Sequence, residues 1–331
     1  NVPRSEQLAA SGQGQHHCLT DRVPDGRPVT CKHPSGRETY SGMSAFSRRP
    51  VAYVVLPAPS LAACEQFCGS LLGLTTVRRD AEIVSCRTDE RVQTLVFSMK
   101  ETAPAVGIEV RDTACLEQMA ARLAAKQAAW SDLDRHQCAQ RKVRAGIAVT
   151  DPSGNRIELV TGVQVSGRRF YAGRDSGVVA LSSVGLRSWA LADDVEFWTA
   201  LGADISDRVG DITYLRMDDA HHRIALYPSS RTGILYVSLA VQSHDHLMQN
   251  SYFLADHQIR IVHGPGLETA SGRIFLRFEG PNDQLFSLEY DEGRYRPGAP
   301  PRQFELSVAA LCSWGSRCDA VSELAAPAAS T

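Results

Sequence analysis

Hydrophobic and polar residues follow one another along this chain in an order that predicts a strand, then a helix, then more strands. Residues 51–56 form an apolar run typical of a strand. Ser60 is a suitable N-cap for a helix over residues 61–72, whose apolar residues fall on one face. Strands over residues 82–87 and 94–98 complete this first unit.

The same order of elements returns in three further units, and the second of these, the third unit of the chain, begins near Ser183. Helices are predicted over residues 113–126, 193–201 and 245–254, and strands over residues 105–110, 146–150, 155–160, 212–217, 223–227, 234–241, 274–278 and 285–290. Recurrence of one unit predicts an α+β fold of tandem βαβββ modules. Pairs of such modules wrap their strands into half-open barrels, so that the inward-pointing side chains of each pair meet in one cavity.

The repeat also suggests a domain organisation. With 331 residues the chain has room for about two domains. We expect one domain over residues 51–162 and a second over residues 181–292, each made from two modules, with the cavity in the second. Residues 1–48 show neither helical nor strand periodicity and are predicted to be an irregular extension, whereas residues 297–331, rich in Pro and then in Ala and Ser, are predicted to be a C-terminal tail.

Composition and charge exclude several classes of function. The formal net charge of -2 gives no electrostatic reason to expect nucleic acid or an anionic membrane as a partner. No apolar run approaches the roughly 20 residues that a membrane span needs, and the N-terminus lacks the pattern of a secretory signal. Nine cysteines, an odd number, favour reduced thiols in a cytoplasmic protein. The oligomeric state stays open, with a homo-oligomer as one alternative.

Some groups of potential ligands lie outside the repeat pattern or at its edges. Those with potential for metal binding are His16, His17, Cys18, Cys31 and His33, and His244, Asp245 and His246. The first group lacks the second close Cys pair of a zinc knuckle, and Asp245 suits the first turn of a helix. Cys312 and Cys318 do not have the spacing of a zinc or redox motif. An irregular tail and an ordinary helix start are therefore the favoured interpretations.

Several short motifs occur in an order that matches one known family. They are Asp-Pro-Ser-Gly-Asn-Arg-Ile-Glu-Leu at residues 151–159, Leu-Gly followed by Ser-Asp-Arg within residues 201–208, Asp-Ala-His-His-Arg-Ile-Ala-Leu at residues 219–226, Gly-Pro-Gly-Leu-Glu at residues 264–268, and Phe-Leu-Arg-Phe-Glu-Gly-Pro at residues 275–281. Over residues 51–292 the chain therefore resembles the two-domain extradiol dioxygenases of the vicinal oxygen chelate (glyoxalase/bleomycin resistance/dioxygenase) superfamily, of the 2,3-dihydroxybiphenyl 1,2-dioxygenase type.

The resemblance implies a C-terminal barrel in which the family holds Fe(II) by two His and one Glu. At the matching positions this chain has Leu186, Tyr236 and Ser287, with Glu289 as the alternative to Ser287 if the last strand is shifted by two residues. No His occurs between Ser176 and Ala220 to replace the first ligand. We therefore expect no metal and no other cofactor, with Fe(II) as the alternative.

The resemblance also implies which residues surround a substrate. The expected catalytic residues are His222, Tyr236 and Glu268, and the expected substrate-binding residues are Arg277, His221, Leu186, Ser287 and Glu289. Imidazole titrates near neutrality, which suits His222, or His221 in another register, to proton transfer. Two alternatives remain: the His pair makes only structural hydrogen bonds, or Arg277 and Glu268 form an internal ion pair that fills the space left by iron.

Together these features predict a metal-independent enzyme that acts on an aromatic or polyketide-like small molecule by general acid–base chemistry. The reaction would be ring opening, isomerisation, elimination or cofactor-free oxygenation, in biosynthesis or in aromatic catabolism. One alternative is an Fe(II) extradiol ring-cleaving dioxygenase with unusual ligands. The other is a non-catalytic protein that binds such a small molecule.

Overall fold

The computed structural model describes residues 44–293, 295–296 and 298–326. The group of His and Cys residues at 16–33 and most of the expected N-terminal extension lie outside the described residues. The part of that extension which is described does not stay irregular, because the first strand already begins at Phe46. No helix in the described part of the chain is long and apolar enough to cross a membrane.

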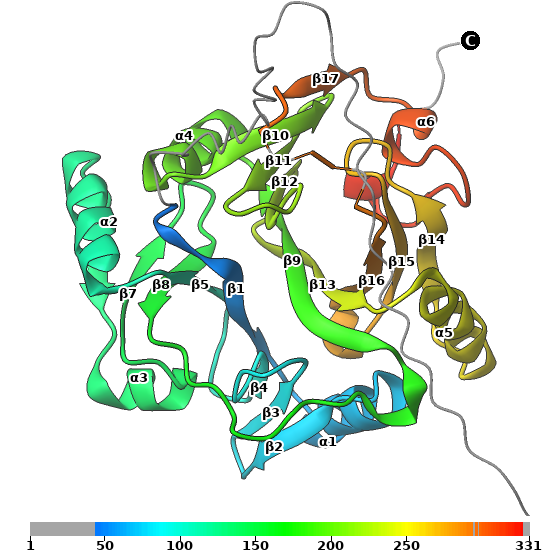
Figure 1. Cartoon of the computed structure of the whole chain (residues 1–331), viewed down its shortest axis with the longest axis horizontal. Coiled ribbons are helices and arrows are strands. Elements are labelled where there is room, and N and C mark those ends of the chain that lie inside the picture. Colours follow the sequence, from blue (N-terminus) through cyan, green and yellow to red (C-terminus); the bar gives the residue numbers. More distant parts are fainter. Residues whose placement is uncertain (1–43, 294, 297, 327–331) are drawn as a thin grey trace, which may run out of the picture. The chain divides into compact units, whose positions relative to one another are not determined.

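The first half of the chain forms an eight-stranded mixed sheet (Figure 1). Its strands are β1 (Phe46–Pro57), β2 (Thr75–Arg79), β3 (Ile83–Arg87), β4 (Leu95–Ser98), β5 (Ala105–Val110), β6 (Trp130–Asp132), β7 (Ala145–Thr150) and β8 (Arg156–Thr161). They lie in the order β2-β3-β4-β1-β5-β8-β7-β6. Strand β1 is antiparallel to β5, and this pair joins the two modules of the sheet.

The second half forms a nine-stranded sheet with the same arrangement of modules. Its strands are β9 (Val178–Ser188), β10 (Asp204–Val209), β11 (Ile212–Arg216), β12 (Ile224–Pro228), β13 (Gly233–Val241), β14 (Ile261–Leu267), β15 (Arg273–Glu279), β16 (Leu285–Asp291) and β17 (Arg302–Phe304). The order is β14-β15-β16-β13-β9-β12-β11-β10-β17, and β9 is antiparallel to β13 just as β1 is to β5.

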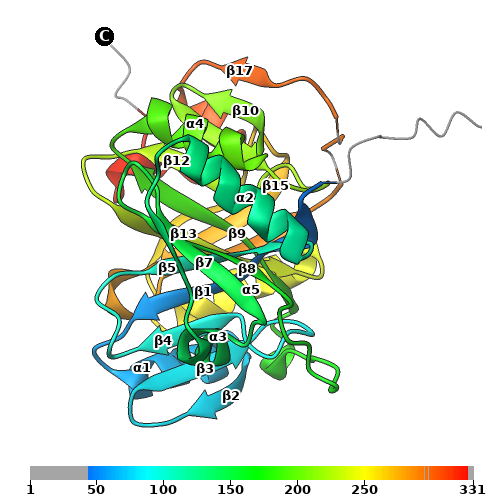
Figure 2. The same cartoon turned by 90° about the vertical axis from the view of Figure 1, so that its left-hand side faces the viewer.

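Helices connect the strands within each module (Figure 2), and a further short helix follows the last strand. They are α1 (Leu61–Gln66), which continues as a short π-helix over Phe67–Leu71, α2 (Thr113–Ala125), α3 (Arg135–Arg141), α4 (Leu191–Leu201), α5 (His244–Asp256) and α6 (Val308–Leu311). Ser60 caps α1 as predicted, since its side chain accepts a hydrogen bond from the backbone N–H of Ala63. Asp245 lies in the first turn of α5, behind the N-cap Ser243.

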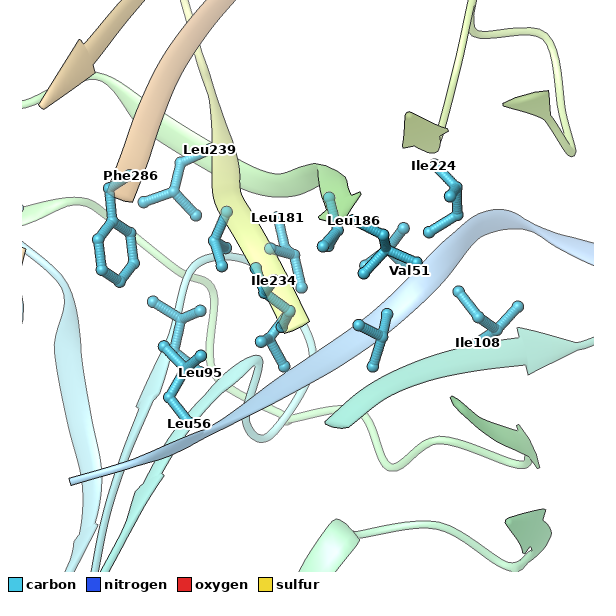
Figure 3. Packing of buried hydrophobic residues seen from close by; sticks show 14 of the residues in the cluster. Val51, Leu56, Leu95, Ile108, Leu181, Leu186, Ile224, Ile234, Leu239 and Phe286 are labelled. Carbon is cyan, nitrogen blue, oxygen red and sulfur yellow. The ribbon is translucent and has the colours of Figure 1, made fainter. Parts of the chain in front are cut away.

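The two sheets share one apolar core (Figure 3). Val51, Leu56 and Ile108 from the first sheet lie in the same buried cluster as Leu186 and Phe286 from the second. Because side chains alternate along a strand, every second residue points away from this core. In each sheet those residues form a separate interior, which we call the N-terminal barrel (around Tyr53) and the C-terminal barrel (around Tyr236).

The C-terminal segment is part of the fold, contrary to the prediction of a tail. Residues 302–304 form β17, which pairs in parallel with β10 at the edge of the second sheet (Figure 2). Leu311, Cys318 and Leu324 are buried in the cluster of the C-terminal barrel. The burial of these apolar side chains outweighs the weak local propensity of the segment for helix or strand. The segment is therefore held against the C-terminal barrel, where its residues border the candidate site.

Candidate functional site

A buried ion pair occupies the C-terminal barrel. Glu268 follows β14 directly, and Arg277 lies on β15; their Oε1 and Nη2 atoms are 3.3 Å apart. Tyr214 donates a hydrogen bond to the same oxygen at 3.3 Å, and Ser271 donates to Oε2 at 2.6 Å. Glu268 is 4% exposed and Arg277 is 3% exposed. The structure therefore brings two predicted site residues together, with Tyr214 and Ser271 as additional partners.

Arg277 is held between aromatic rings. Its guanidinium carbon lies 4.7 Å from the ring centre of Tyr236 and 4.2 Å from that of Phe275, and Nη1 lies 3.5 Å from Nδ1 of His263. Burial alone would lower the pKa of Arg277, but nearby Tyr227 and other acidic groups outweigh burial and raise it. Arg277 is therefore a permanent cation, and its Nε has no hydrogen-bond partner in the described structure.

Tyr236 fills the space opposite a glycine. It pairs with Gly185 across β13 and β9, and a Cβ atom at position 185 would lie only 2.5 Å from the ring. The hydroxyl of Tyr236 lies 3.3 Å from that of Tyr227. Burial, and then the neighbouring Tyr227, raises the pKa of Tyr236 well above its usual range. Tyr236 is a neutral hydrogen-bonding group at neutral pH and not a phenolate base.

A second buried ion pair, between Arg273 and Glu289, belongs to a hydrogen-bond network that spans four strands. Glu289 on β16 accepts hydrogen bonds from the hydroxyls of Ser183 on β9, at 3.3 Å, and Ser238 on β13, at 2.6 Å. Arg273 on β15 donates to the same carboxylate at 3.2 Å. Hydroxyl groups and a guanidinium therefore satisfy the hydrogen-bonding capacity of the Glu289 carboxylate. Its network occupies β9, β13 and β16, the strands on which the resemblance places the metal ligands.

These residues do not fit an Fe(II) centre. The prediction for Leu186 is wrong, because its side chain lies in the shared apolar core (Figure 3) and the alternate β9 residues Ser183 and Gly185 point into the barrel. Tyr236 and Ser287 do point inward, but neither is an imidazole or a carboxylate. Across residues 44–326, as far as they are described, no three His, Cys, Asp or Glu side chains are placed to hold a metal. Two His and one carboxylate are the ligand set that non-haem Fe(II) requires.

The adjacent histidines lie in a bend just before β12, not within the strand. Nδ1 of His222 is 3.0 Å from Nδ1 of His221, and Nε2 of His221 is 2.9 Å from Oδ2 of Asp207. Both rings are fully buried. Burial, and then the charge of Arg273, lowers the pKa of His222 well below its usual range, so this imidazole is neutral.

A cavity of about 370 Å³ opens at the edge of the C-terminal barrel. The residues around it include Asp207, Leu267, Glu268, Tyr295, Pro300 and Arg302. Glu268 is thus the predicted catalytic residue that borders open space, whereas His222, Tyr236 and Arg277 lie behind it. Sequence reasoning missed Asp207 and Arg302 as site residues, although Ser206-Asp207-Arg208 belongs to one of the motifs that carry the resemblance.

Comparisons with solved structures agree with this architecture. The Mn(II)-bound glyoxalase from Novosphingobium aromaticivorans superposes with a TM-score of 0.73 at 22% identity, over 83% of this chain and 93% of that one. A catechol 2,3-dioxygenase gives 0.74 at 17% identity, over 85% and 98%. Homoprotocatechuate 2,3-dioxygenase from Brevibacterium fuscum, in complex with 3,4-dihydroxyphenylacetate, gives 0.74 at 17% identity, over 83% and 91%.

The chain therefore has the vicinal oxygen chelate fold in its two-domain form, as the sequence motifs predict. No protein-family model and no curated protein sequence matches the chain. At identities below a quarter, the structural likeness establishes the fold and leaves the activity to be argued from the site.

Proposed function

We propose that this protein is a metal-independent enzyme that binds a small aromatic or polyketide-like molecule in the cavity of the C-terminal barrel and transfers protons through Glu268. The observation that carries this proposal is the position of Glu268. Its carboxylate borders the cavity and is also held from behind by Arg277, Tyr214 and Ser271. A fixed carboxylate at the wall of a cavity is suited to general acid–base catalysis.

The surroundings of Glu268 support proton transfer over redox chemistry at a metal. Arg277 keeps a positive charge beside the carboxylate, and Ser271 fixes the orientation of Oε2. A carboxylate held in this way accepts a proton from a hydroxyl or an activated C–H group of the ligand and returns it at another atom, as isomerisation or elimination requires. The ring of Tyr295 and the apolar side chains of Leu267 and Pro300 suit a planar ligand.

One observation favours a second candidate, a non-catalytic binding protein. His222 and Tyr236, which the sequence predicts to be catalytic, are fully buried and do not border the cavity. If the ion pairs of the barrel only fill the position of a lost metal, the cavity retains binding without chemistry.

The test uses metal-stripped protein and a panel of catechols that includes 3,4-dihydroxyphenylacetate, with binding followed by calorimetry and products by mass spectrometry. We expect turnover that survives chelator. Glu268→Gln should lower turnover by about 10²–10⁴-fold, the usual effect of losing an acid–base group, with little change in affinity. The matched control is Glu158→Gln, which removes a buried carboxylate with Arg and Tyr partners from the N-terminal barrel.

Three outcomes separate the alternatives. Binding without conversion, unchanged in Glu268→Gln, supports the binding protein. Turnover that requires added Fe(II), together with stoichiometric iron in the purified protein, contradicts both proposals. Equal losses of turnover in Glu268→Gln and Glu158→Gln would show that the effect comes from destabilisation and not from the site.

A further inference from the structure

A line of hydrogen bonds leads from the cavity into the C-terminal barrel. It begins at Asp207, which borders the cavity, and passes from its Oδ2 to Nε2 of His221 over 2.9 Å. It then passes from Nδ1 of His221 to Nδ1 of His222 over 3.0 Å. It ends at Nε2 of His222, which is buried and has no partner in the described structure.

The carboxylate at the start of this line fixes the first proton. Arg302 donates to Oδ1 of Asp207 through its backbone N–H at 2.8 Å and through Nε at 3.1 Å. Burial alone would raise the pKa of Asp207, but the hydrogen bonds from His221 and Arg302 outweigh it and lower the pKa. An ionised carboxylate only accepts hydrogen bonds. Nε2 of His221 must therefore carry a proton and donate it.

The position of the proton on His221 determines the position of the proton on His222. A neutral imidazole carries one N–H, so Nδ1 of a neutral His221 is an acceptor. The facing Nδ1 of His222 must then be the donor, which leaves Nε2 of His222 without a proton. A positive charge on the resting pair is disfavoured, because Arg273, Arg277 and Arg223 already surround His222.

We propose that Asp207 and His221 are positioning residues that hold His222 in its Nδ1–H tautomer, so that Nε2 is an unprotonated base inside the C-terminal barrel. When Nε2 takes a proton from an acidic group, the Nδ1 proton of His222 passes to Nδ1 of His221. His222 stays neutral, and the new positive charge rests on His221 beside Asp207. The arrangement thus moves charge away from Arg273 and toward a carboxylate that stabilises it.

The tautomer of each ring is measurable without any ligand. This inference can therefore fail while the proposed function stands, and the proposed function can fail while this inference stands. Protein with ¹⁵N-labelled histidine is studied by two-bond ¹H–¹⁵N correlation at pH 8, and the signals of the two rings are assigned among the ten histidines with His221→Gln and His222→Gln. The expected result is Nε2–H for His221 and Nδ1–H for His222.

Asp207→Asn should reverse both tautomers. The amide oxygen can accept from the backbone N–H and Nε of Arg302, which places the amide N–H₂ against Nε2 of His221 and turns that nitrogen into an acceptor. The Nη2 group of Arg302, which donates to Oδ2 in the wild type, belongs to a half-exposed side chain and turns to water. His221 then carries its proton on Nδ1, and His222 carries its proton on Nε2. The matched control is Asp218→Asn, which removes a carboxylate paired with Arg223, the residue after His222, and should leave both tautomers unchanged.

Two results would overturn the proposal. One is a wild-type spectrum in which His222 carries its proton on Nε2, and this result decides the matter even if Asp207→Asn fails to fold. The other is a folded Asp207→Asn protein whose two tautomers equal those of the wild type.

Discussion

The interiors of the two barrels are built alike but differ in how completely their polar atoms are paired. In the N-terminal barrel Tyr53 lies opposite Gly107, as Tyr236 lies opposite Gly185 in the C-terminal barrel. Glu158 accepts from the hydroxyl of Tyr53 at 2.7 Å, from Nε of Arg141 at 2.9 Å and from Nε of Arg156 at 3.0 Å. One carboxylate thus satisfies a tyrosine and two arginines at short distances.

The C-terminal barrel spreads similar groups over two ion pairs with longer bonds. The polar atoms without a hydrogen-bond partner in the described structure include four here, Nε2 of His222, Nε of Arg273, Nε of Arg277 and Oγ of Ser287, and two on β3 of the first sheet, Oγ of Ser85 and Nε of Arg87. A buried polar atom without a partner costs about 1–3 kcal/mol, so this barrel is less stable than it would be with full pairing. Under the proposed function, this difference is expected of a barrel that serves stability and a barrel that retains polar groups for a ligand.

The largest expected effect on stability comes from removing the carboxylate of Glu158, the better-paired of the two. Glu158→Ala removes two hydrogen bonds of the buried Arg141, which keeps its ion pair with Glu101, and leaves Tyr53 without its acceptor. It should lower the free energy of unfolding by about 3–5 kcal/mol, as measured by urea denaturation. Glu268→Ala should cost less, about 1–3 kcal/mol, because water from the adjacent cavity can reach Arg277. Equal costs for the two variants would remove the distinction between the barrels.

Acid should weaken the C-terminal barrel first. Burial, and then the charge of Arg277, lowers the pKa of His263 to about 3. Because the folded pKa lies below the unfolded value, the unfolded chain binds more protons between about pH 6.5 and pH 3. Stability is therefore full above that window and falls by about 1.4 kcal/mol per pH unit within it.

Hydrogen exchange between pH 7 and 5 should show β14 and β15 opening before the strands of the N-terminal barrel. His263→Gln serves as the control and should flatten the fall in unfolding free energy. The variant is needed because burial, and then Asp194, raises the pKa of Asp151 to about 7. The folded protein therefore takes up a proton at Asp151 as the pH falls below about 7, which raises stability where His263 lowers it. A pH dependence that His263→Gln leaves unchanged would contradict the assignment to this histidine.

Replacing Gly107 or Gly185 by alanine should lower the unfolding free energy by the same amount. A Cβ at Gly107 or at Gly185 would lie 2.5 Å from the facing tyrosine ring, so each Gly→Ala variant should lose about 1–3 kcal/mol of unfolding free energy through overpacking. Gly69→Ala is the control, since a Cβ there meets nothing within 4 Å. A large loss at Gly107 with none at Gly185 would mean that the C-terminal barrel is loose enough to admit extra atoms.

The smallest expected effect concerns two serines that face each other across β13 and β16. Ser238 donates to Glu289 at 2.6 Å, so Ser238→Ala should cost about 1–3 kcal/mol. Ser287 has no hydrogen-bond partner in the described structure, and Ser287→Ala should raise the unfolding free energy by about 1 kcal/mol, because it removes an unpaired buried hydroxyl. A clear loss for Ser287→Ala would show that its hydroxyl is bound to a molecule inside the barrel.

The sequence predicts most of the fold because the modules are encoded locally. The periodicity of apolar residues and the N-cap Ser60 mark elements that the structure contains. The helix α3 was missed although Asp134 and Gln137 form a capping box, a signal that is readable in the sequence. Strand β17 could not be foreseen, because it has three residues and its pairing with β10 depends on contacts far apart along the chain.

The site shows where a motif is a weaker guide than strand alternation. The motif places Leu186 at a ligand position, yet Val184 and Leu186 are apolar while Ser183 and Gly185 are small or polar. That alternation already assigns Leu186 to the apolar core. The cavity beside Glu268 depends on Tyr295 and Arg302 meeting residues from other modules, and no local pattern encodes such a meeting.

The shared apolar core sets an order in which the protein can be made. The N-terminal sheet is complete once Thr161 of β8 has been synthesised, whereas the second sheet awaits Phe304 of β17, about 140 residues later. At the usual rates of translation this interval lasts roughly 7–30 s. During that time Val51, Leu56 and Ile108 lack the side chains of the second sheet that later cover them (Figure 3). Exposed apolar surface of this kind makes a nascent chain prone to aggregation, so slower translation should lengthen the period of risk.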